Sequence, residues 1–149
     1  MYNYQILIEY DGTQFVGWQI QKNGLSIQEV LQKAIRKITK SKTIIFGSGR
    51  TDAGVHSSGQ SAHFKIKNKI KNLKDLKKSI NFFVSRYSIS VLKTVKKPLT
   101  FHARHSAVKR TYKYYIINRR SPLSLDRNRA WHVKKKLDIK LMQKGAKFL

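Results

Sequence analysis

The sequence lacks several residue types, and each absence limits what the protein can be. It contains no cysteine, which excludes disulfides, thiolate zinc sites, iron–sulfur clusters and cysteine nucleophiles. No apolar run approaches the ~18 residues that a transmembrane helix needs. The first residues do not form a basic segment followed by an apolar stretch, as a signal peptide would. We therefore expect a cytoplasmic protein.

Acidic residues are the second deficit. The 149 residues include 32 Lys and Arg but only 7 Asp and Glu, which gives a formal charge of +25. A domain with this charge repels itself and is tolerated most easily when it binds a polyanion, so electrostatics indicate nucleic acid as the first partner. A lysine-biased proteome would also raise the lysine count, but it would enrich acidic residues as readily. Hydrophobic residues make up 40% of the chain, which is enough for a folded core.

The first hundred residues contain a complete set of alternating elements. Apolar and polar residues alternate over 2–10, as in a half-buried strand, and Ser26 and Glu29 form a capping box before a helical pattern. Periodicity predicts a strand, a helix, two strands, a helix and a strand, at about residues 2–10, 26–40, 43–46, 60–66, 73–83 and 88–95. This order predicts an α+β domain over 1–100 with the ferredoxin-like β-α-β-β-α-β arrangement: an antiparallel sheet with both helices on one face.

The residues after about 100 begin a second set of elements. A long strand is predicted over 101–118, and a helix over 137–149 with Asp138 as its N-cap and Leu149 on its apolar side. A strand and a helix without partner strands cannot form a core. We therefore expect 101–149 to be the start of a second, incomplete α+β half-domain, in a shortened or partial chain.

One acidic residue stands apart from the turn and helix-cap positions of most of the others. Asp52 lies in the Gly/Ser-rich loop predicted over 47–59, where glycines let the backbone approach a ligand closely. A carboxylate near Arg50 stays ionised at neutral pH, which suits a nucleophile or a base. Alternatively, Asp52 only caps the loop by accepting backbone N–H bonds. On spacing alone, the capping role is the simpler explanation.

Two other binding patterns are incomplete. The glycine loop resembles the end of a phosphate-binding P-loop, but Ile44 stands where that motif needs glycine and Arg50 where it needs lysine. His102 and His105 have the spacing of metal ligands, yet no cysteine or acidic residue lies nearby to complete a site. We therefore expect no nucleoside-triphosphate site, and histidines that are structural or contact RNA.

Tyrosines and cations are interleaved near residue 112. Aromatic side chains between cations suit stacking on an extruded base between phosphate contacts, but the same pattern is typical of an amphipathic strand with core tyrosines. The two explanations are equally good for Tyr112, and the core is favoured for Tyr114. The element order of the first domain is also that of the RRM, but the predicted strand 60–66 lacks the glycine and aromatic pattern of RNP1.

Seven segments, in order along the chain, together resemble the TruA-type tRNA pseudouridine synthases. The longest is the octet Gly49-Arg-Thr-Asp-Ala-Gly-Val-His56. The others are Tyr10-Asp-Gly12, Gly17-Trp-Gln19, Ser26-Ile-Gln28, Gly59-Gln60 with His63-Phe64, Phe101-His-Ala-Arg104 and Arg110-Thr-Tyr-Lys-Tyr114.

The resemblance implies a function and a set of site residues. The reaction would isomerise uridine to pseudouridine at positions 38–40, in the anticodon stem-loop of tRNA, without a metal or organic cofactor. Asp52 would be the catalytic carboxylate, acting as nucleophile or base, Arg50 would take the place of the flipped base, and Tyr112 would stack on the target uracil. Further substrate contacts are expected from Arg104, Arg110 and His56. The family also implies a homodimer that binds tRNA, with no role for DNA or a membrane.

Two other functions stay open at this point. A non-catalytic tRNA-binding fragment would bind with a steep salt dependence, a log–log slope of roughly −0.9 per duplex phosphate neutralised. A ribosome-associated basic protein would need no carboxylate at position 52.

Overall fold

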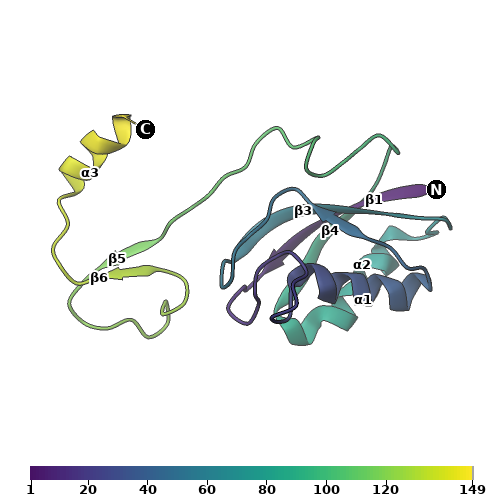
Figure 1. Cartoon of the computed structure of the whole chain (residues 1–149), viewed down its shortest axis with the longest axis horizontal. Coiled ribbons are helices and arrows are strands. Elements are labelled where there is room, and N and C mark those ends of the chain that lie inside the picture. The colour runs from purple at the N-terminus through teal and green to yellow at the C-terminus, as the bar shows by residue number, and fades with distance from the viewer. Residues whose placement is uncertain (149) are drawn as a thin grey trace. The chain divides into compact units, whose positions relative to one another are not determined.

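The computed structural model describes residues 1–148, which form two compact units, Met1–Arg110 and the residues from Thr111 onward. The first unit is a four-stranded antiparallel sheet of order β2-β3-β1-β4, with both helices on one face (Figure 1). Its elements are β1 (Tyr2–Tyr10), α1 (Ile27–Thr39), β2 (Ile45–Gly47), β3 (Ser57–Ile66), α2 (Leu73–Val84), a 3-10 turn (Ser85–Tyr87) and β4 (Ile89–Lys97). The predicted α+β class and element order are confirmed.

The core of the first unit follows from the two periodicities. Tyr4, Ile6 and Ile8 alternate along β1 and are fully buried, in one cluster with the apolar side of α1. Helix α1 begins as predicted, since Ser26 Oγ accepts a hydrogen bond from Glu29 N at 3.2 Å. No helix in residues 1–148 is both long enough and apolar enough to cross a membrane.

The loop that carries Asp52 is shorter than the predicted 47–59. Strand β2 includes Gly47, and β3 begins at Ser57, which pairs with Tyr10 of β1. The connection therefore spans 48–56. The alternation of apolar and polar residues could not reveal this extension of β3. The first residues of β3 are small and polar, and they join the sheet only through backbone pairing with β1.

The long strand predicted over 101–118 is wrong. Only Ile116–Asn118 form a strand, β5. The start of the segment instead turns against the first unit, where Asn3 Nδ2 donates hydrogen bonds to Pro98 O at 2.9 Å and Phe101 O at 2.8 Å. Alternating residues become a strand only where another strand's backbone can satisfy their N–H and C=O groups. At the start of this segment the backbone groups bond to Asn3 and not to another strand.

The second unit contains short elements. Strand β5 pairs in parallel with β6 (Trp131–Val133), and α3 (Ile139–Gly145) is followed by a 3-10 turn, Ala146–Phe148 (Figure 1). Asp138 is the N-cap of α3 as predicted, because its side chain accepts from Leu141 N at 3.0 Å. The helix is shorter than predicted, and Leu149 lies outside the described residues.

Candidate active site

Hydrogen bonds hold the 48–56 loop on both sides of Asp52. Before it, the Thr51 carbonyl accepts from Trp18 N at 2.9 Å, and the Thr51 hydroxyl lies 2.9 Å from the Tyr10 hydroxyl. After it, Gly54 N donates to a carbonyl in the segment between β1 and α1, at 3.2 Å. The backbone of Asp52 is therefore fixed by residues that lie far away in the sequence.

Two glycines allow this close approach of backbones. Gly17 has φ +112°, and a Cβ on it would lie 2.5 Å from the Thr51 carbonyl oxygen. A Cβ on Gly12 would collide with the carbonyl of Val55. The segment between β1 and α1 thus touches the Asp52 loop backbone to backbone, which only glycine permits at these positions.

The Asp52 side chain differs from the hydrogen-bonded backbone of its loop. The side chain is exposed, and within residues 1–148 it forms no hydrogen bond or ion pair. The bonded atom of Asp52 is its backbone carbonyl, which accepts from Val55 N at 3.2 Å. The capping explanation requires the carboxylate to accept backbone N–H bonds, and the described chain contains none. A carboxylate on a fixed backbone is left open to a ligand.

Arg50 and Tyr112 are both exposed. Arg50 forms no ion pair with Asp52 in the part of the chain that the structure describes. Tyr112 is 66% exposed and belongs to the second unit. Tyr114, predicted in a core, is 90% exposed, because the described part of this unit has no buried layer to cover it.

Arg110 uses its guanidinium within the protein. Its Nε donates to Ser48 O at 2.9 Å, at the start of the Asp52 loop, and its Nη2 donates to Arg104 O at 2.8 Å. Arg110 therefore joins the loop to the segment after β4. The Arg104 side chain is exposed. Of these two predicted substrate contacts, Arg104 presents its charge to solvent and Arg110 has a bridging role.

His56 ends the Asp52 loop and contacts the segment after β1. Its Nδ1 accepts from Gly12 N at 3.1 Å and lies 3.2 Å from Asp11 Oδ1. Asp11 Oδ1 also accepts from Thr13 N at 3.0 Å, as is typical of an Asp that forms a turn. These contacts make His56 part of the support of the loop.

Tyr10 supports the loop from below the surface. Burial raises the pKa of Tyr10 above its usual value, while hydrogen bonds to Thr51 and Ser57 lower it. The hydroxyl is therefore protonated at neutral pH and can donate to Thr51. The sequence places Tyr10, Gly17 and Trp18 in motif segments but does not predict that they support the Asp52 loop, because contacts between distant loops leave no periodic pattern.

Among residues 1–148, no group of three or more His, Asp or Glu side chains could hold a metal ion.

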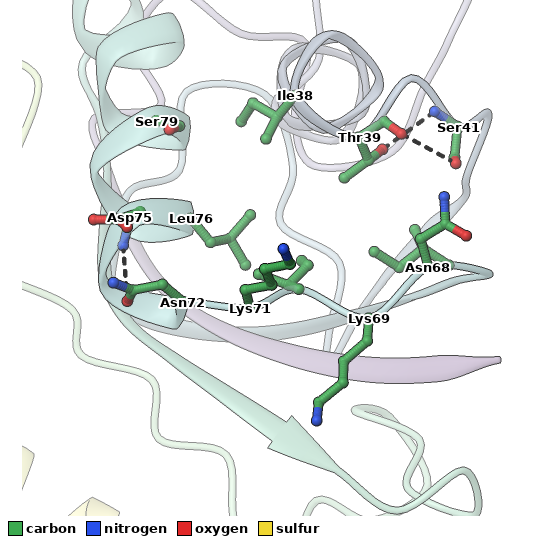
Figure 2. A pocket seen from close by; sticks show the side chains of 12 residues that line it. Ile38, Thr39, Ser41, Asn68, Lys69, Lys71, Asn72, Asp75, Leu76 and Ser79 are labelled. Carbon is green, nitrogen blue, oxygen red and sulfur yellow. Dashed lines mark hydrogen bonds between the residues drawn. The ribbon is translucent and has the colours of Figure 1, made fainter.

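One cavity of the first unit lies away from this site. Its volume is about 350 Å³, and it opens between the end of α1, the end of β3 and the start of α2 (Figure 2). Ile38 and Leu76 are among its apolar walls, and Lys69 and Lys71 lie on its loop. Strand β3 separates it from the Asp52 loop by ~30 Å, at about 3.3 Å per residue.

Comparisons with known proteins agree on one family. A family model described as tRNA pseudouridine synthase matches residues 6–106. This range includes the Asp52 loop and the segment with Arg104, and it ends before Arg110 and Tyr112.

Curated relatives match the chain over nearly its full length. A tRNA pseudouridine synthase A of Pelagibacter ubique is 58% identical over 149 residues, which cover 100% of this chain and 61% of that protein. The synthase of the same name from Ehrlichia ruminantium (strain Welgevonden) is 46% identical over 98% of this chain and 59% of its own length. That of Parvibaculum lavamentivorans is 44% identical over 100% and 60%. The chain thus spans about 60% of the length of these relatives.

Proposed function

The chain belongs to the tRNA pseudouridine synthase family, and on that premise we propose that it takes part in the isomerisation of uridine to pseudouridine in tRNA, with Asp52 as the catalytic carboxylate. The single observation that carries this proposal is the exposed Asp52 side chain, unbonded within residues 1–148, on a loop whose backbone is bonded on both sides. A structural carboxylate would be used by the fold, and a catalytic one has to be left for the substrate.

The reaction defines what the site must supply. The bond from ribose C1′ to N1 of uracil breaks, the base turns, and a bond from C1′ to C5 forms. C5 loses a proton and N1 gains one, so the reaction needs no oxidant or reductant. Because uracil is not activated, the site must supply a nucleophile or a base, and Asp52 can serve as either.

The target base must first leave the RNA stack, which costs a few kcal/mol. Arg50 is exposed two residues before Asp52 and would fill the space that the base vacates. Tyr112 is exposed and would stack on the uracil face. Arg104 would hold a phosphate. Arg110 and His56 would act by keeping the loop in place, because their polar atoms already contact the protein.

The finer features of the proposal follow from the family resemblance. The substrate would be the anticodon stem-loop of tRNA, at uridines 38–40, and the working form a cytoplasmic homodimer. The charge of +25 supports a polyanionic substrate.

The test uses tRNA that carries tritium at C5 of uridine, because that hydrogen is released to water when C1′ bonds to C5. The chain is assayed alone and joined to the part of the Pelagibacter ubique relative that it does not match, since it spans 61% of that protein. Asp52→Ala is expected to reduce tritium release by at least about a hundredfold. The affinity for tRNA is expected to stay within about twofold, because Asp52 bears no positive charge for phosphates.

The matched control is Asp75→Ala, which removes another exposed carboxylate, in the first turn of α2. It should release tritium at the unchanged rate. Full tritium release by the Asp52→Ala protein would contradict the proposal, and so would absence of release from both unsubstituted proteins.

A second function is favoured by one observation, the 60% coverage of the relatives. A chain that spans 60% of such a relative and carries a charge of +25 can bind tRNA without isomerising it. In that case the chain alone would bind tRNA with a steep salt dependence and release no tritium, while the joined protein would release it.

A further inference from the structure

A cluster of aromatic rings that includes Phe46, His63 and His102 lies on the first unit, close to the start of the Asp52 loop. Phe46 of β2 stacks on its cross-strand partner His63 of β3, with ring centroids 5.3 Å apart. His102 lies 5.4 Å from Phe46 and 4.6 Å from His63, and His105 lies 4.4 Å from His102. The roles proposed above for Asp52, Arg50 and Tyr112 do not use these rings.

The cluster has a buried floor and an exposed surface. His63 is 1% exposed, and its Nδ1 accepts a hydrogen bond from Ala103 N at 3.1 Å. Phe46, in contrast, is 44% exposed, His102 is half-buried and His105 is exposed. The buried imidazole thus fixes the position of rings that reach solvent.

The charges around the cluster match a nucleotide. Burial, followed by the charge of His102, lowers the pKa of His63 to about 4, and burial together with the charge of His105 lowers that of His102. At neutral pH these two rings are therefore uncharged. Lys65 and Arg104, whose charges contribute to these shifts, are exposed beside them. Neutral rings flanked by exposed cations suit a base and its phosphate.

The cluster is linked to the Asp52 loop through two bonds of one side chain. Ser48, two residues after Phe46, accepts from Arg110 Nε at 2.9 Å, and Arg104 O accepts from Nη2 of the same guanidinium at 2.8 Å. The ring surface and the loop are therefore held together within the first unit.

We propose that Phe46, His102 and His105 form a stacking surface for an unpaired nucleobase of the tRNA, a neighbour of the uridine that Asp52 acts on. This inference rests on the proposed function and adds to it a second base-binding surface. Proteins recognise single-stranded RNA by stacking unpaired bases on aromatic side chains.

The experiment compares tRNA binding by fluorescence anisotropy for three substitutions of one ring. Phe46→Ala and Phe46→Leu are expected to weaken binding by about fivefold or more, whereas Phe46→Trp, which restores a π face, binds within about twofold of the unchanged chain. The matched control is Phe82→Ala, since Phe82 of α2 is 78% exposed and lies on the helical side of the sheet. It should leave the affinity unchanged. Far-ultraviolet circular dichroism checks that each variant is folded.

Two outcomes overturn the inference. If Phe46→Leu binds tRNA as tightly as the unchanged chain, the ring only packs against protein. If Phe82→Ala weakens binding as much as Phe46→Ala, the effect is not specific to this surface. Failure of the proposed function is distinguishable, because it is measured as tritium release by the Asp52→Ala protein, and the anisotropy experiment does not depend on catalysis.

Discussion

The two units of the chain have similar alternating and helical patterns, but their apolar residues end up in different places. In the first unit, four strands and two helices cover each other, and residues such as Ile6, Leu31 and Phe64 are fully buried. From Thr111 through Phe148, Leu123 is the only buried residue, and strands β5 and β6 pair over three residues each. An amphipathic pattern thus produces a buried core only where its apolar side can pack against a sheet with enough strands.

The largest expected effect concerns the core of the first unit. Ile35→Ala on α1 removes a fully buried side chain and should lower the free energy of unfolding by about 2–5 kcal/mol. Leu141→Ala on α3, where leucine is 63% exposed, should change it by less than about 0.5 kcal/mol. Urea unfolding followed by fluorescence measures both. Trp18 is buried in the first unit and Trp131 is exposed in the second, so single-tryptophan forms report on each unit separately. Equal losses from both substitutions would remove the contrast between the units.

The next effect is a dependence of stability on pH that belongs to the first unit. The pKa of His63 is about 4 in the folded chain and 6.5 ordinarily, so between these values the unfolded chain binds more protons. The stability contributed by neutral His63 is complete above pH 6.5 and is lost as the pH falls toward 4, by about 3 kcal/mol in total.

Urea unfolding at several pH values checks this prediction. The variant His63→Gln should show a smaller slope between pH 4 and 6.5 than the unchanged chain, because it lacks the titrating group. His132→Gln in the second unit is the matched control and should keep the full slope. An unchanged slope for His63→Gln would show that groups other than His63 cause the acid sensitivity.

A smaller effect is expected where the first unit supports Asp52. Gly17→Ala places a Cβ 2.5 Å from the Thr51 carbonyl at φ +112°, and it should cost about 1–3 kcal/mol of stability and reduce tritium release. Gly59→Ala is the control, because the nearest atom to its Cβ is a Leu7 methyl group at 3.8 Å. A Gly17→Ala protein with unchanged stability and activity would mean that the backbone contact does not position the loop.

The smallest effect separates the two arginines of the segment after β4. Arg110→Ala loses hydrogen bonds to two carbonyls and should cost about 1 kcal/mol of stability, whereas Arg104→Ala should cost less than about 0.5 kcal/mol. In tRNA binding the order should reverse, because both side chains are exposed but the Arg104 guanidinium forms no hydrogen bond or ion pair within residues 1–148. Urea unfolding and anisotropy measure the two properties. The same rank order in both assays would contradict the division of roles.

Local sequence patterns predicted the first unit well, because the patterns that specify its helices and strands involve residues close together in the sequence. The capping of α1 by Ser26 and the alternation of β1 depend on residues within a few positions of each other. The strand predicted over 101–118 failed for the opposite reason: alternation there met no partner strand, and Asn3 bonds the start of the segment from the far end of the chain. Tyr114 was placed in a core for the same reason and is 90% exposed.

For the candidate site, the sequence identifies the residues, and the tertiary contacts decide which of their side chains are bonded within the protein and which stay open. The octet around Asp52 could be found without a structure, and so could the excess of positive charge, because both are properties of the chain order and composition. Whether Asp52 caps its loop or stays open, whether Arg110 bonds to two other segments, and whether Phe46 meets two histidines depend on contacts between residues distant in sequence. Such contacts form only when the sheet brings β2, β3 and the segment after β4 together, and no local periodicity encodes them.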